Sequence, residues 1–118
     1  MKLLFSVFLL LFATGGKDML AGRWESRPSA KGNITGVVFK EGGILEGYIN
    51  KKPFVSGTYN FNQNDSILSF VDNGCNGVEG TYKVMFFSSA DSLRFRAISD
   101  SCRERLEGME RLVMGRVK

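Results

Sequence analysis

Two cysteines, Cys75 and Cys102, carry the most reactive side chains in this chain of 118 residues. In an oxidising compartment a lone pair of cysteines forms a disulfide. A reactive thiol would instead require a Cys-x-x-Cys motif or a cysteine at the start of a basic helix. The sequence contains neither pattern, so we predict a disulfide between Cys75 and Cys102 that fastens the start of one strand to the link between the final two.

The chain contains no histidine. This absence excludes Ser–His and Cys–His catalysis and removes a common zinc ligand. Acid–base catalysis would then need a pair of carboxylates. Most acids, however, are expected in turns or on outward positions: Glu41, Asp65, Asp72 and Asp91. We therefore expect no enzymatic activity, no metal site and no cofactor.

Acidic and basic residues alternate near the end of the chain, from Asp100 to Arg111. Such alternation is typical of a solvated, charged face. Within this segment we expect Asp100 and Arg105 to form a structural ion pair that fixes the last corner of the fold.

Aromatic side chains offer a second kind of site, a pocket for an apolar molecule. A strand turns every second side chain to the same face. Gly-Thr-Tyr occurs twice, at residues 57–59 and 80–82, with Gly47-Tyr48 as a looser variant. Five aromatic residues are the candidates for an inward-facing ligand pocket: Tyr48, Tyr59, Phe70, Tyr82 and Phe95. The alternative is that these rings, with Trp24, simply fill the core.

These residues need a scaffold of strands. Alternating or β-branched segments, separated by turns rich in glycine, asparagine and aspartate, predict eight strands. They cover residues 21–27, 34–40, 44–50, 54–61, 66–71, 77–87, 92–98 and 106–117. No connection is long enough for a parallel crossover. We therefore predict an all-β fold, an eight-stranded antiparallel up-and-down barrel with one disulfide. An open sandwich is the alternative.

The last segment carries two signals. Residues 101–109 contain an Arg-Glu-Arg-Leu-Glu run that suits a helix, which Asp100 could cap. Gly108 and the β-branched residues that follow favour a strand instead. We adopt the strand.

Residues 1–16 are expected to be a secretory signal peptide. Lys2 supplies positive charge, residues 3–13 are apolar apart from Ser6, and residues 14–16 are small. The apolar run is shorter than the roughly 20 residues of a transmembrane helix. The alternative is a buried N-terminal element. We expect a secreted or periplasmic domain over residues 17–118, with no transmembrane segment.

The net charge of +4 is mild, and the basic residues are scattered. Lys51-Lys52 is the only adjacent pair of lysines. A nucleic-acid partner is therefore not expected. The expected partners are a small lipophilic ligand or a protein.

Gly22-Arg23-Trp24 resembles the Gly-x-Trp signature of lipocalins and their relatives. The likeness continues through the two Gly-Thr-Tyr strands, Cys75, Leu93-Arg-Phe95 and Asp100-x-Cys102-x-x-Arg105, over nearly all of the mature chain. Together these motifs resemble the small secreted bacterial lipocalin-like (calycin) proteins. The resemblance implies an eight-stranded calycin barrel, a disulfide and no catalytic activity.

The resemblance also implies structural roles for Gly22 and Trp24, beside the Asp100–Arg105 pair. In lipocalins the tryptophan of this signature packs at the closed end of the barrel beneath an arginine. Arg105 and Arg111 are the candidates here. The chain is shorter than full-sized lipocalins and lacks room for their C-terminal helix.

Two functions agree with these predictions. The first is non-catalytic binding of a small apolar or amphipathic ligand inside the barrel. The alternative is a protein-binding barrel, such as a periplasmic protease or lysozyme inhibitor, which would use residues 17–20 and 27–33 for contact. A cavity of roughly a few hundred Å³ would favour the first function, and a filled core would favour the second.

Overall fold

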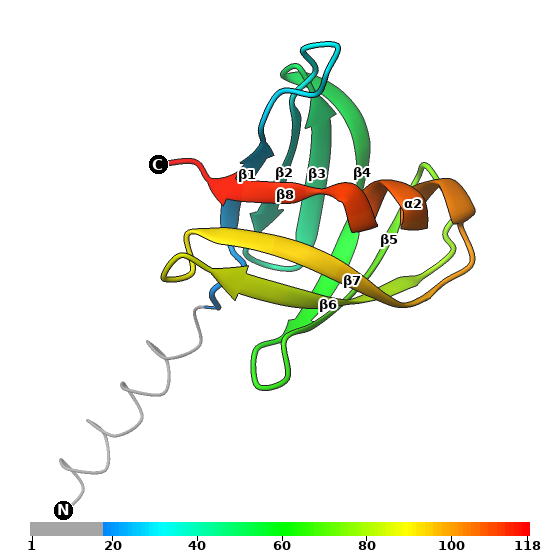
Figure 1. Ribbon diagram of the computed structural model, residues 1–118. Coiled ribbons are helices and arrows are strands. Elements are labelled where there is room, and N and C mark those ends of the chain that lie inside the picture. Colours follow the sequence, from blue (N-terminus) through cyan, green and yellow to red (C-terminus); the bar gives the residue numbers. More distant parts are fainter. Residues whose placement is uncertain (1–17) are drawn as a thin grey trace, which may run out of the picture.

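The computed structural model describes residues 18–118, which form a closed barrel of eight strands paired in sequence order (Figure 1). Every neighbouring pair of strands is antiparallel. The first strand pairs with both the second and the last, so the sheet has no free edge. The predicted antiparallel up-and-down barrel is confirmed. The predicted signal peptide lies outside the described residues.

The strands are short and follow one another through tight turns. They are β1 (Gly22–Ser26), β2 (Thr35–Lys40), β3 (Ile44–Ile49), β4 (Lys52–Asn62), β5 (Ile67–Asp72), β6 (Gly80–Phe87), β7 (Ser92–Asp100) and β8 (Val113–Arg116). In the turn between β2 and β3, Gly42 and Gly43 have φ angles of 90° and 81°. Glycine adopts such angles without strain, which explains the tight reversal at this point.

Side chains alternate between the two faces of the barrel wall. In β7, Leu93 and Phe95 are buried, while Arg94 and Arg96 are exposed. The same alternation runs along β4, where every second residue from Val55 is half-buried. The buried core lies inside the barrel and consists of Leu20, Trp24, Phe39, Leu45, Leu68, Phe70, Tyr82, Val84, Leu93, Phe95 and Met114.

One end of the barrel is closed around Trp24, which has no solvent exposure. Its indole Nε1 donates to the carbonyl of Leu20 at 2.8 Å. The guanidinium of Arg116 lies 4.3 Å from the centre of the indole ring. Arg116 also donates to the carbonyls of Met19 and Ala21, at 2.7 and 3.1 Å. The segment before β1 and the end of β8 therefore seal this closed end together.

The arginine that covers Trp24 is Arg116, so the expectation of Arg105 or Arg111 is wrong. Arg116 stands directly opposite Trp24 in the pairing of β8 with β1. Arg105 and Arg111 instead belong to a helix that precedes β8. Strand register, which the motif alone does not specify, decides which arginine reaches the indole.

The last predicted strand is wrong in its first half. Residues Arg103–Arg111 form a helix, α2, and only Val113–Arg116 form a strand. The helix follows β7 and leads into β8 (Figure 1). The Glu110 carboxylate accepts a hydrogen bond of 3.0 Å from the backbone N–H of Ala97 in β7. Gly108, inside the helix, lowers its intrinsic stability. The contact of Glu110 with the barrel helps to offset this effect.

Candidate ligand-binding site

The end of the barrel opposite Trp24 contains a cavity of about 340 Å³. Its walls come from β2, β3, β4, β5, β7, β8 and α2. Most of the lining is apolar, and the inner side chains that it reaches include Leu45, Leu68, Phe70 and Phe95. We call this the open end, to distinguish it from the closed end around Trp24.

The cavity exists because the two halves of the barrel are filled differently. In the closed half, aromatic rings pack against one another: Phe86 lies 6.2 Å from Trp24 and 6.2 Å from Phe61 between ring centres. At the open end, α2 borders the cavity with Gly108, which has no side chain. No atom lies within 4 Å of the place where a Cβ on Gly108 would stand. A glycine on the helix therefore leaves space at the cavity wall.

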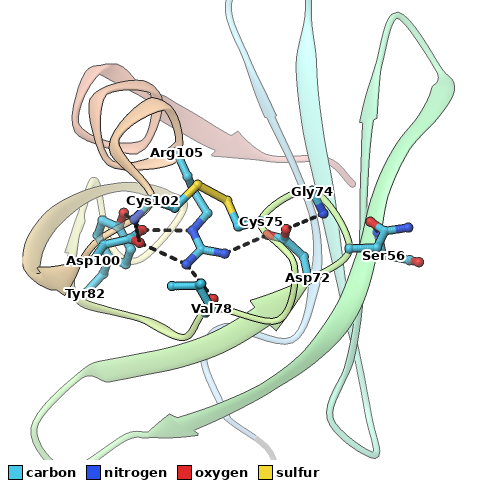
Figure 2. Close-up of polar contacts among 10 residues, drawn as sticks. Ser56, Asp72, Gly74, Cys75, Val78, Tyr82, Asp100, Cys102 and Arg105 are labelled. Carbon is cyan, nitrogen blue, oxygen red and sulfur yellow. Dashed lines mark hydrogen bonds and ion pairs between the residues drawn. A yellow bond between two sulfur atoms is a disulfide. The ribbon is translucent and has the colours of Figure 1, made fainter.

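A buried ionic network forms one wall of the cavity, with the guanidinium of Arg105 between two carboxylates (Figure 2). Its Nε and one Nη donate to Asp100 at 2.8 and 2.9 Å, and the other Nη donates to Asp72 at 3.2 Å. A further bond of 2.8 Å reaches the carbonyl of Val78. The side chains of Arg105, Asp72 and Asp100 are only 8%, 5% and 0% exposed. The network joins the ends of β5 and β7 to the first turn of α2.

A β-bulge in β7 turns Asp100 toward the interior. Ile98 has no partner in β6, because the residues on either side of it pair with adjacent positions there. The extra residue shifts the inward alternation by one, so Asp100 lies opposite the buried Gly80. A Cβ on Gly80 would stand 2.8 Å from the Asp100 carboxylate and 2.9 Å from the Arg105 guanidinium. Glycine at this position therefore makes room for the ion pair.

Burial and hydrogen bonding set the charges in the network. Burial, helped by the hydrogen bond to Asp100, raises the pKa of the Tyr82 phenol well above its usual range. Burial also disfavours the charged form of Asp100, but hydrogen bonds from Arg105, Tyr82 and the Cys102 N–H outweigh this effect and lower its pKa. For Arg105, burial is likewise outweighed by Asp100 and Asp72, and the pKa is raised. The tyrosine is thus neutral at pH 7, and the Asp100–Arg105 pair is ionised.

The predicted disulfide between Cys75 and Cys102 is confirmed, with a Cα–Cα distance of 6.2 Å. It links the loop between β5 and β6 to the residue that precedes α2. Figure 2 shows the disulfide next to the Arg105 guanidinium. Both cysteines border the cavity, so the cross-link also holds one side of its wall.

Three of the five predicted ligand-binding residues, Tyr48, Phe70 and Phe95, border the cavity. Tyr82 is fully buried beside the two phenylalanines, with its ring centre 5.8 Å from Phe70 and 6.4 Å from Phe95, and is not among the residues that border the cavity. Tyr59 is not among them either; its phenol donates to the carbonyl of Lys40 at 2.8 Å. The structure therefore places Phe70, Tyr82, Phe95 and Tyr59 in or against the core, and Tyr48, Phe70 and Phe95 along the cavity.

Tyr48 borders the cavity as predicted, but its ring packs on the outer face of the barrel and does not point inward. Its phenol donates to Glu25 at 2.5 Å, and the Arg23 guanidinium lies 5.3 Å from its ring centre. The ring covers Gly36, where a Cβ would stand only 2.1 Å from its Cζ. Tyr48 is therefore buried by a contact outside the barrel, and this burial raises the pKa of its phenol.

Asp72 is the functional candidate that the sequence reasoning missed. The expectation that it lies in an exposed turn is wrong, because Asp72 is the last residue of β5 and is buried. The signal was present in the sequence: Leu68 and Phe70 face inward, and alternation places Asp72 on the same face. Phe54, which borders the cavity with 66% of its surface exposed, was also missed. Phe54 is the unpaired residue of a bulge in β4, and the sequence does not predict this bulge.

The two segments considered for a protein contact differ in exposure. Leu20 is fully buried and the N–H of Met19 donates to Gln63 at 2.7 Å, so residues 18–20 do not project as an arm. Residue 17 lies outside the described part of the chain. Residues 27–33, in contrast, are all exposed and form a loop closed by a hydrogen bond of 2.9 Å between Ser29 and Asn33.

Comparison with known proteins adds no assignment. The chain matches no protein-family model, and no curated protein is similar to it at a significant level. Within residues 18–118, no three His, Cys, Asp or Glu side chains gather closely enough to hold a metal ion. No helix in that part of the chain has the length and apolar character to cross a membrane.

Proposed function

We propose that this protein is a non-catalytic, lipocalin-like binding protein that holds one small apolar or amphipathic molecule in the open-end cavity. The observation that carries the proposal is the cavity volume of about 340 Å³. Pockets that enclose small molecules typically start at roughly 300 Å³ and combine apolar walls with a few polar groups. A barrel of eight strands is just wide enough to hold one such ligand.

The family and the compartment belong to the same proposal. The motifs around Gly22, Trp24 and the two cysteines, together with the closed barrel, support a relationship to small secreted bacterial lipocalin-like (calycin) proteins. The disulfide supports a secreted or periplasmic location, because thiols stay reduced in most cytosolic compartments.

A cavity-filling substitution on α2 tests the proposal. Gly108→Phe would place a ring at the cavity wall, where a Cβ meets no atom within 4 Å. Gly108→Ala is the matched control, because it also replaces the flexible glycine but adds only one methyl group. The probe is N-phenyl-1-naphthylamine, a neutral apolar fluorophore whose emission rises in an apolar pocket.

We expect the wild type and Gly108→Ala to bind one molecule of the probe per chain. Gly108→Phe should bind it at least about 10-fold more weakly, because the ring takes the place of the ligand. Circular dichroism would establish that both variants remain folded. Equal binding by Gly108→Phe, or no binding by the wild type, would contradict the proposed function.

The exposed loop of residues 27–33 supports a second candidate function, capture of a protein such as a protease or a lysozyme. Trypsin and lysozyme activity, measured with and without an excess of the protein, test this function directly. Inhibition that disappears when residues 29–32 are deleted would favour it. Inhibition by neither form would count against it.

A further inference from the structure

The charged groups around the cavity indicate which ligands it accepts. From their arrangement we infer that the cavity selects an apolar molecule with a cationic head group, such as a primary ammonium. The inference rests on the proposed function, since it specifies the ligand of the same cavity. Three charged residues border the cavity, two of them acids: Asp72, Glu104 and Arg105.

The positive charge of Arg105 is already matched inside the protein. Asp100, which lies behind the cavity wall with no exposed side-chain surface, binds the guanidinium through two hydrogen bonds. Asp72 and Glu104 therefore leave an excess of negative charge at the cavity. The neighbouring basic residues Lys51 and Lys52 do not border it and are exposed to solvent, which screens them.

Hydrogen-bond capacity distinguishes the two buried carboxylates. A carboxylate offers about four acceptor sites. Asp100 receives hydrogen bonds from two nitrogens of Arg105, from the phenol of Tyr82 and from the N–H of Cys102, which fill its sites. Asp72 receives only two among the described residues, from the N–H of Gly74 at 2.8 Å and from Arg105 at 3.2 Å. Asp72 thus retains acceptor capacity next to the cavity.

An anionic head group is less favourable at the same place. Arg105 has five N–H groups and makes four of the hydrogen bonds described above, so one N–H remains to attract an anion. An anion bound there would, however, lie close to both Asp72 and Asp100. In a poorly solvated wall, this repulsion outweighs one additional hydrogen bond. A protonated amine is favoured at the same place, because it donates a hydrogen bond to Asp72 and is attracted by the negative charge of Glu104.

Three ligands with the same eight-carbon chain test the inference: octylamine, 1-octanol and octanoate, titrated at pH 7 by isothermal titration calorimetry. We expect octylammonium to bind at least about 10-fold more tightly than octanoate, with octanol between them. High salt should reduce the preference for octylammonium over octanoate. The reduction should be larger the more the bound head group is exposed to solvent, because salt screens exposed charges more than buried ones.

Two substitutions locate the effect. Glu104→Gln, on the exposed side of the cavity wall, should weaken octylammonium about 3-fold and leave octanol unchanged. Asp72→Asn should weaken octylammonium about 10-fold. Glu107→Gln is the matched control, because Glu107 is an exposed acid on α2 that does not border the cavity. It should change none of the three affinities.

The outcomes separate the ligand class from the proposed function. Octanoate that binds as tightly as octylammonium, with octanol also bound, would overturn the cationic preference and leave the ligand-binding function standing. Failure of all three ligands to bind would overturn both. If Asp72→Asn does not fold, the ligand series and the comparison of Glu104→Gln with Glu107→Gln still decide the question.

Discussion

Arg105 is the single residue on which the open end of the barrel depends most. Its guanidinium contacts Asp100 at the end of β7, Asp72 at the end of β5 and the carbonyl of Val78 in the loop between β5 and β6. It also lies 4.8 Å from the ring centre of Phe70. Few of these contacts are local in sequence, so one side chain holds together segments that the backbone leaves apart.

Replacing Arg105 by methionine should therefore destabilise the protein strongly. The change removes the positive charge and leaves Asp100 buried without compensation, which typically costs about 3–5 kcal/mol. Guanidinium chloride denaturation with the disulfide intact would measure the loss. Arg103→Met is the matched control, since Arg103 is an exposed residue of the same helix and should change stability by less than about 0.5 kcal/mol. Equal effects of the two substitutions would contradict the role of the network.

Acid should weaken the fold through Asp100. Its pKa is lower in the folded state than in the unfolded chain, so the unfolded chain binds a proton more readily. The stabilisation is complete above the unfolded pKa, about 4, and is lost as the pH falls through the lower folded value. Urea denaturation at several pH values should show the free energy of unfolding decreasing below about pH 4. An Asp100→Asn variant, less stable at pH 7, should show a flatter profile over this range.

At the residue scale, the sequence identifies the aromatic residues but not the face of every one. In both Gly-Thr-Tyr motifs the glycine and the tyrosine are two residues apart and share a face. In Gly47-Tyr48 they are adjacent and must face opposite sides, so the looser variant was misleading. The outer contact of Tyr48 with Gly36 depends on the pairing of β2 with β3, which no local pattern reveals.

At the scale of elements, α2 is the main difference from the predicted fold. The residues of the helix carried both signals, and the glycine and later valines favoured the wrong one. The helix forms because its side chains gain tertiary contacts, among them the Arg105 network and the Glu110 bond to β7. Such contacts routinely override local propensity and cannot be read from a single segment.

The glycine in α2 gives a stability prediction. Gly108→Ala should raise the free energy of unfolding by about 1 kcal/mol, because alanine loses less backbone entropy in a helix and nothing lies in the way of its methyl group. Thermal denaturation would measure the gain. A decrease in stability would mean that the space at Gly108 is needed by the folded protein itself.

The bulge in β7 is a second element that the sequence does not predict. Strict alternation from Leu93 would place Asp100 outside the barrel, and the unpaired Ile98 reverses this. The motif resemblance nevertheless pointed to Asp100 and Arg105 together. Sequence motifs can thus indicate which residues belong together without giving the backbone irregularity that brings them together.

At the scale of the whole molecule, the topology could be predicted because the connections are short. Alternating segments separated by turn residues leave few arrangements other than a meander, and the absence of crossovers excludes parallel pairing. The cavity at the open end could not be predicted from the sequence. Its volume depends on how side chains from seven elements fill a common space, and composition alone is equally consistent with a filled barrel.

The disulfide should contribute to the stability of the whole domain. In the chain-entropy model, a cross-link over a separation of 27 residues stabilises the folded state by about 3.5 kcal/mol. The double variant Cys75→Ser/Cys102→Ser should therefore unfold at a clearly lower temperature than the oxidised wild type. Adding a reductant should lower the midpoint of the wild type and leave that of the double variant unchanged. A loss below about 1 kcal/mol would mean that the network holds α2 without the cross-link.

The pairing of β1 with β8 also has a consequence for the order of events during synthesis. Trp24 needs the side chain of Arg116, and Arg116 in turn bonds the carbonyls that precede β1. A nascent chain in which residue 116 has not yet been made can form hairpins but lacks the partner that completes its first strand. Closure of the barrel therefore has to wait for residue 116, and until then both outer strands remain available to chaperones and to neighbouring chains.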